Sequence, residues 1–174
     1  EVLPMTSPKK GSTRHLALAA MFAALALIFS YVEVLLPIPV PIPGVKLGLA
    51  NLVILIALYR LGIRLAFSIN CVRIVIAGLL FSGVFGMIYS FAGGILSILV
   101  MFLLKKAGCF SIVGVSMAGG VAHNLGQLLT ACLIVSNFGL MSYFAVLFFT
   151  GMVSGILIGI LAYFIERRLP PDIH

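Results

Sequence analysis

The sequence is short of charged side chains, and above all of acidic ones. Only 9% of its 174 residues are charged, whereas a soluble domain averages about a quarter, so this chain cannot cover a water-facing surface. Its acidic residues are Glu1, Glu33, Glu166 and Asp172. They are too few and too scattered for the paired aspartates that usually hold magnesium on a prenyl diphosphate.

Several catalytic motifs are missing as well. The chain has no GxxxxGK[ST] phosphate loop, no HExxH zinc motif, no CxxC pair and no nucleophile elbow. We therefore predict no catalytic residue, no metal ligand and no cofactor. Any uphill transport would draw on an ion gradient or a partner ATPase. Cys71, Cys109 and Cys132 lack metal-site spacing and are interpreted as small hydrophobic side chains.

What the chain does have is long apolar runs. Hydrophobic residues make up 63% of it, and they do not alternate as in barrel strands. A membrane span needs about 20 apolar residues, and six segments fit. We predict an all-α membrane protein with a flexible cytoplasmic N-terminus at residues 1–14, a six-helix transmembrane domain at 15–168 and a cytoplasmic tail at 169–174. The predicted spans are residues 15–36, 45–61, 63–81, 84–104, 111–135 and 143–167.

The basic residues orient these spans. With six spans, one side of the membrane receives nine of the eleven lysines and arginines: Lys9, Lys10, Arg14, Arg60, Arg64, Lys105, Lys106, Arg167 and Arg168. Only Lys46 falls in a connection on the other side, and Arg73 lies within a span. The positive-inside rule then places both termini in the cytoplasm. Because the basic residues do not gather on one soluble face, no nucleic-acid partner is predicted.

A proline-rich connection, LLPIPVPIPGVKLG at residues 35–48, is predicted on the outer side. Pro37, Pro39, Pro41 and Pro43 alternate with aliphatic residues, so the segment should be extended and stiff rather than helical. Two interpretations remain open. The segment is either a rigid linker or a lid over an outward-facing cavity.

Small residues mark where helices can approach closely in lipid. The sixth predicted span carries one stripe, Gly151, Gly155 and Gly159. The fifth carries Gly114, Ala118, Ala122 and Gly126 at the same spacing. We interpret both stripes as packing inside one bundle, with homodimerisation as the alternative.

The first predicted span has two small-residue strips. At about 100° per residue, one narrow face holds Ala19, Ala23, Ala26, Ser30 and Glu33. Ala20 and Ala24 form a second strip beside it. One strip could serve the bundle and the other could dock a partner helix, although internal packing of both is also open.

Polar residues inside the spans predict a binding site. Arg73 lies ten residues into the third predicted span, where a charge is costly and usually functional. The candidate substrate-binding residues are Arg73, Asn70, His123, Asn124, Gln127, Asn51, Lys46 and Glu33. They would line one outward-opening cavity in which Arg73 binds a carboxylate or phosphate, the amides set orientation, and His123 binds ligand or titrates. The alternative is an internal ion pair between Arg73 and Glu33, with the amides joining helices.

Four stretches carry a resemblance to a known family: PIPGVKLGLANLVILIALY, NCVRIVIAGLLFSG, FAGGILSILVMFLLKK and GGVAHNLGQLL. Over residues 14–168 the chain resembles the Gx transporter family, also known as heptaprenyl diphosphate synthase component I. More broadly it is similar to the six-span substrate-binding (S) components of energy-coupling factor transporters. That resemblance implies a prokaryotic plasma-membrane protein with cytoplasmic termini, whose partners are membrane lipids, a coupling transmembrane subunit and ATPase subunits.

The resemblance also implies roles for particular residues. Docking on the coupling subunit falls to Ala19 and Ala23, then to Ala20 and Ala24, and the lid to residues 40–46. The expected function is capture of a small polar or anionic solute from the outer side. The main alternative is a non-catalytic membrane subunit in isoprenoid or quinone metabolism or in a redox assembly, and a stand-alone secondary carrier is a third possibility.

Overall fold

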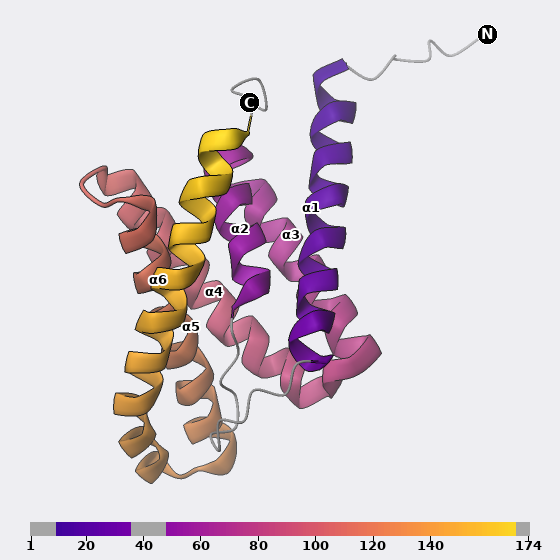
Figure 1. The fold of residues 1–174 in the computed structure, drawn as a ribbon. Helices are drawn as coiled ribbons and strands as arrows, with labels where there is room; N and C mark the ends of the chain where they lie inside the picture. Colours follow the sequence, from indigo (N-terminus) through magenta and orange to yellow (C-terminus); the bar gives the residue numbers. More distant parts are fainter. Residues whose placement is uncertain (1–9, 36–47, 170–174) are drawn as a thin grey trace, which may run out of the picture.

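The computed structural model describes residues 10–35 and 48–169, and every regular element in those ranges is helical (Figure 1). This confirms the predicted all-α class. Lys46, the proline segment and the predicted lid at 40–46 lie outside the described residues. The elements are α1 (Lys10–Leu35), α2 (Leu49–Arg60), α3 (Gly62–Ala77), a π-helical turn η1 (Gly78–Ser82), α4 (Gly83–Ala107), α5 (Ile112–Val135), a 3-10 turn η2 (Phe138–Tyr143) and α6 (Phe144–Arg168).

Four of the described helical stretches are long and apolar enough to cross a membrane: Thr13–Leu35, Gly62–Ala107, Ile112–Val135 and Phe138–Arg168. Such a chain is a multi-pass membrane protein. The second stretch, at 46 residues, is far longer than one span requires. It contains both α3 and α4.

That long stretch folds back on itself at Gly83. The residue has φ of 68°, a value that favours glycine because it has no side chain. A Cβ placed on Gly94 would lie 2.7 Å from Asn70 Nδ2, and one on Gly78 would lie 2.8 Å from Met87 Cβ. Met87 thus contacts Gly78, and Gly94, further along α4, contacts Asn70, earlier in α3, so the two helices run antiparallel.

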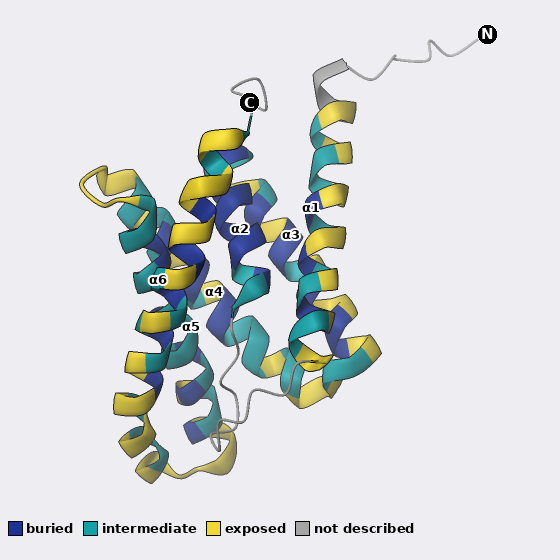
Figure 2. Ribbon diagram, in the orientation of Figure 1, coloured by how far each residue is buried: buried dark blue, intermediate teal, exposed yellow. Residues whose placement is uncertain are grey.

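Helix α2 is shorter than the span predicted at residues 45–61. It has 12 residues and rises about 18 Å at 1.5 Å per residue, against about 30 Å for the hydrocarbon core of a bilayer. The helix begins after Gly48, whose φ is 80°. Its side chains are buried around nearly the whole circumference (Figure 2). An apolar helix buried in protein and one facing lipid have similar sequences, which explains the over-long prediction.

The helices form two groups around α2. Helix α1 packs on α2 and α3, whereas α5 packs on α4 and α6, and α2 also contacts α6. The start of α1 and the end of α6 lie at the same end of the bundle (Figure 1). The last turn of α1 lies toward the opposite end (Figure 1), and Glu33 in that turn contacts Leu49 at the start of α2.

Glycine contacts hold α5 against α6. A Cβ on Gly155 would lie 2.7 Å from Met117 Cα, and one on Gly159 would lie 2.7 Å from Val113 Cα. The predicted α6 stripe thus packs inside the bundle. Gly126 of the predicted α5 stripe also packs inside the bundle, but against α4, where its Cβ would lie 2.7 Å from Ala92 O. The α5 glycine that faces α6 is Gly120.

Polar contacts join the ends of α2, α4 and α6. Arg60 Nε lies 2.8 Å from Glu166 Oε1, and Arg60 Nη2 donates hydrogen bonds to Glu166 O at 2.9 Å and Leu169 O at 3.3 Å. Lys105 Nζ donates to Leu58 O at 2.8 Å. These contacts fix the C-terminal end of α2, which we call the charged end of the bundle.

The two alanine strips of α1 face different ways. Ala19 and Ala23 are partly buried and pack against the main apolar core, on the side of the fully buried Ala26. Ala20 and Ala24 are exposed. Ala19 and Ala23 thus face the core, because they share a helical face with residues that pack on it, whereas Ala20 and Ala24 form the more exposed of the two strips.

Candidate functional site

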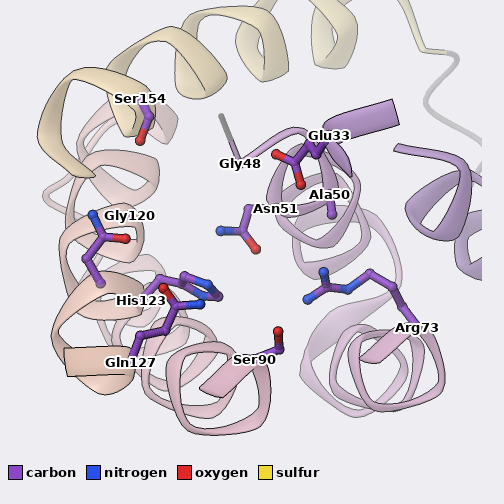
Figure 3. A pocket seen from close by; sticks show the side chains of 11 residues that line it. Glu33, Gly48, Ala50, Asn51, Arg73, Ser90, Gly120, His123, Gln127 and Ser154 are labelled. Carbon is purple, nitrogen blue, oxygen red and sulfur yellow. The ribbon is translucent and has the colours of Figure 1, made fainter. Parts of the chain in front are cut away.

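A polar cavity lies where all six α-helices meet. Each helix contributes at least one polar side chain to its lining: Glu33 from α1, Asn51 from α2, Arg73 from α3, Ser90 from α4, His123, Asn124 and Gln127 from α5, and Ser154 from α6. The cavity volume is about 30 Å³, and the whole hollow, open solvent included, amounts to about 460 Å³. Figure 3 shows the labelled polar side chains pointing toward a common centre. We call this space the central cavity.

Two hydrogen bonds fix the position of the Arg73 side chain. The residue is 8% exposed, and its Nη2 donates a 2.7 Å hydrogen bond to Asn70 Oδ1, one turn earlier on α3. Its Nη1 donates to Ser30 Oγ at 3.3 Å, and Ser30 in turn donates to Ala26 O. Among the described residues, the buried Nε has no hydrogen-bond partner. The guanidinium end points into the central cavity (Figure 3).

The side chain of Glu33, a residue of α1, contacts the start of α2. Its Oε1 accepts a 2.7 Å hydrogen bond from Leu49 N, the first amide of that helix. A carboxylate is stabilised there because helix amides at an N-terminus are otherwise unsatisfied and carry partial positive charge. Within the described part of the chain, the hydrogen bonds of Arg73 go to Asn70 and Ser30 rather than to this carboxylate. The two opposite charges thus share one cavity.

The predicted amides divide into two groups. Asn70 is 2% exposed and supports Arg73 from outside the cavity lining. Asn124 lines the cavity, but its Nδ2 donates a 2.7 Å hydrogen bond to Leu147 O and so joins α5 to α6. Asn51 and Gln127 line the cavity. Asn124 therefore joins two helices, as one of the two interpretations of the amides expected. Asn51 and Gln127 face the cavity, as the other expected.

Sequence reasoning missed the serines of the lining. Ser90 and Ser154 reach the cavity from α4 and α6. A serine in a span gives little signal in the sequence, because serine is common there and often bonds only to its own helix. Ser154 Oγ does bond in that way, to Gly151 O at 3.3 Å. Only their position on the inward face distinguishes them, and no motif in the sequence marks that face.

Two further cavities adjoin the first. A second cavity, which we call the deep branch, has a volume of about 20 Å³; it shares Gly48, Asn51, Gly120 and Ser154 with the central cavity and extends to Ser97. A side cavity of about 20 Å³ shares Glu33, Arg73 and Ser90 with the central cavity and reaches Phe81 and Met87. Arg73 therefore lines both the central cavity and the side cavity.

The chemistry of the central cavity suits an anion. Guanidinium donors form strong, charge-assisted hydrogen bonds with carboxylates and phosphates, whereas the N-terminal end of α2 is already bound by the carboxylate of Glu33. Among the described residues, no group of three His, Cys, Asp or Glu side chains comes close enough to hold a metal ion.

The fold and the cavity define a multi-pass helical membrane protein with a buried polar site. A family model, described as heptaprenyl diphosphate synthase component I, matches residues 22–165, which is more than half of the chain. The chain therefore belongs to the heptaprenyl diphosphate synthase component I family. Comparisons with curated proteins and with solved structures found no match.

Proposed function

We propose that this protein is the membrane-embedded substrate-binding component of an energy-coupling factor type uptake transporter, and that it captures a small anionic solute. The observation that carries the proposal is the position of Arg73. A guanidinium that is 8% exposed points into a cavity to which every α-helix contributes a polar side chain. Such a charge is expensive in a membrane unless it serves a function.

The proposed topology has six crossings, with both termini in the cytoplasm of a prokaryotic cell and the protein in its plasma membrane. Three features support it: the reversal at Gly83, the common end of α1 and α6, and the gathering of Arg60 and Lys105 at the charged end. By the positive-inside rule that end faces the cytoplasm. The cavity, bordered by Glu33 and Gly48, then lies in the outer half of the membrane.

The energy for uptake comes from partner subunits in this proposal, a coupling transmembrane subunit and ATPases. The exposed strip of α1, Ala20 and Ala24, is the proposed docking surface, because small side chains let a partner helix approach closely. Changing both alanines to leucine should prevent co-purification of the coupling subunit. A control change, Val153→Leu on the exposed face of α6, should not. Co-purification that survives the double change would remove the docking role from this strip.

The binding site itself is tested by calorimetry on detergent-purified protein, with inorganic phosphate and butanoate as probes. Arg73→Gln should abolish binding of whichever probe the wild-type protein binds. Arg64→Gln, a change at an exposed arginine of the same helix, should leave binding intact. Equal affinity in the wild type and the Arg73 variant would disprove the anion site. Native mass spectrometry of protein purified from its own host would then identify the retained solute.

A second candidate function follows from family membership. The family is named for a component of a synthase, which favours a non-catalytic membrane subunit that supports isoprenoid metabolism. In that case the protein should co-purify with a prenyl-transferring enzyme, and the enzyme should lose activity when this subunit is removed. Co-purification with ATPase subunits favours the transporter instead.

A further inference from the structure

The deep branch runs away from Arg73. It shares Gly48 and Asn51 with the central cavity, but Arg73 does not line it. Its far side is formed by Ser97 and Met101 of α4 together with Ser116 of α5. The branch therefore presents a different set of side chains next to the cavity that Arg73 lines.

Ser97 has an unusual environment for a buried serine. It is 3% exposed, and its Oγ has no hydrogen-bond partner among the described residues. Helical serines and threonines commonly donate to the carbonyl four residues earlier, as Ser30 does to Ala26 O and Thr130 to Gly126 O. Ser97 has no such bond in the described structure. Its hydroxyl therefore keeps its hydrogen-bonding capacity for another group.

A glycine lets the Met101 side chain pack closely beside this hydroxyl. A Cβ on Gly119 of α5 would lie 3.3 Å from Ser97 Oγ and 2.6 Å from Met101 Cγ. Any larger residue at this position would narrow the branch. Ser116, which is 5% exposed, provides a second hydroxyl in the same lining.

The described lining of the branch is neutral. It consists of hydroxyl, amide, glycine and apolar groups, with no charged side chain. A second ionic group on the ligand would be buried there without a counter-charge, which is costly. A hydroxyl or amide would instead find Ser97 as a partner.

Building on the proposed function, we propose that the solute is bipolar: an anionic group binds at Arg73, and a neutral hydrogen-bonding group at its other end binds Ser97. The carbon chain between them passes Asn51 and Gly120, which line both cavities. The site would thus select hydroxy- or amido-substituted acids over dicarboxylates and over simple alkyl acids.

Two series of probes test this inference. Straight-chain carboxylates from butanoate to octanoate are compared with their ω-hydroxy counterparts by calorimetry on the detergent-purified protein. At the length that spans the two groups, the hydroxy acid should bind about tenfold more tightly, since tenfold corresponds to one good hydrogen bond. Ser97→Ala should remove this preference and leave the affinity of the alkyl acid unchanged. Ser68→Ala, at an exposed serine bonded to Arg64 O, should change neither.

The outcomes separate the two levels of the proposal. If alkyl and hydroxy acids bind equally at every length, or if Ser97→Ala keeps the preference, the branch holds only water or apolar chain and the inference is wrong. If Arg73→Gln leaves both series bound as before, the anion site fails instead. If neither series binds the wild-type protein, the carboxylate form of both proposals is overturned.

Discussion

Asn70 Oδ1 accepts a 2.7 Å hydrogen bond from Arg73 Nη2, so a neutral group holds the buried cation without cancelling its charge. We predict that Asn70→Asp weakens binding of anionic probes more than tenfold, because a carboxylate in this position would neutralise Arg73. The melting temperature should stay the same or rise, since an ion pair replaces a neutral contact. Calorimetry and thermal unfolding in detergent measure the two effects. A parallel loss of both binding and stability would contradict this explanation.

Glu33 places a negative charge in the same cavity as Arg73. Replacing it with glutamine keeps an oxygen that can accept the hydrogen bond from Leu49 N but removes the charge. We expect Glu33→Gln to raise the affinity for butanoate or phosphate several-fold, because like charges in one cavity repel. The start of α2 should lose about 0.5–1 kcal/mol of stabilisation, the usual value of a carboxylate at a helix N-terminus. An unchanged affinity would mean that Glu33 does not act on the bound anion.

The close contact between α6 and α5 depends on glycines, which have no side chain. A Cβ at Gly159 would press on backbone, 2.7 Å from Val113 Cα, so Gly159→Ala should cost about 1–3 kcal/mol through overpacking. Gly114→Ala in α5 is the matched control, because its nearest neighbour would lie at an ordinary 3.7 Å. The control should be neutral or slightly stabilising, since alanine favours helix. Equal melting temperatures for the two variants would rule out this packing.

Arg60 joins α2 to α6 through more than its ion pair with Glu166. It also bonds the carbonyl oxygens of Glu166 and Leu169, so Arg60→Met should destabilise the protein more than Glu166→Gln. We expect about 3–5 kcal/mol for the arginine change, the range for breaking a buried charged network. Arg64→Met, at an exposed arginine, should cost less than about 0.5 kcal/mol. Denaturant titration in detergent gives the order, and a reversed order would exclude the network.

Two buried serines should respond to alanine in opposite directions. Ser97 has no hydrogen-bond partner in the described structure, so Ser97→Ala removes an unsatisfied hydroxyl and should leave the ligand-free protein equally or more stable. Ser30 accepts a hydrogen bond from Arg73, so Ser30→Ala should cost about 1–3 kcal/mol. Thermal unfolding without added ligand measures both. A stabilising Ser30 change would show that Arg73 does not depend on it.

The long apolar runs were enough to predict the class and most of the helices. They could not predict the length of α2, because an apolar helix surrounded by protein meets the same chemical demand as one in lipid. Nor could they tell which α1 strip faces inward. Ala19 and Ala20 are chemically identical, and only the position of the core against Ala19 distinguishes them.

The candidate site, too, could be predicted from the sequence only in part. The cost of charge in lipid singled out Arg73, and one-turn spacing placed Asn70 beside it. The bond from Asn124 to Leu147 depends on how α5 and α6 meet, and so does the inward position of Ser154. Such partners come from distant parts of the chain and leave no local pattern in the sequence.

Helix α2 forms part of the cavity wall at Gly48 and Asn51 and ends at Arg60, in the contacts of the charged end. A single short helix therefore joins the wall of the central cavity to the charged end of the bundle. Because close-packed side chains surround it and packed interiors transmit strain, a solute that displaced the cavity end of α2 would also displace its charged end. The surface at the charged end would then differ between the solute-bound and solute-free forms, and a partner subunit bound there could distinguish the two forms.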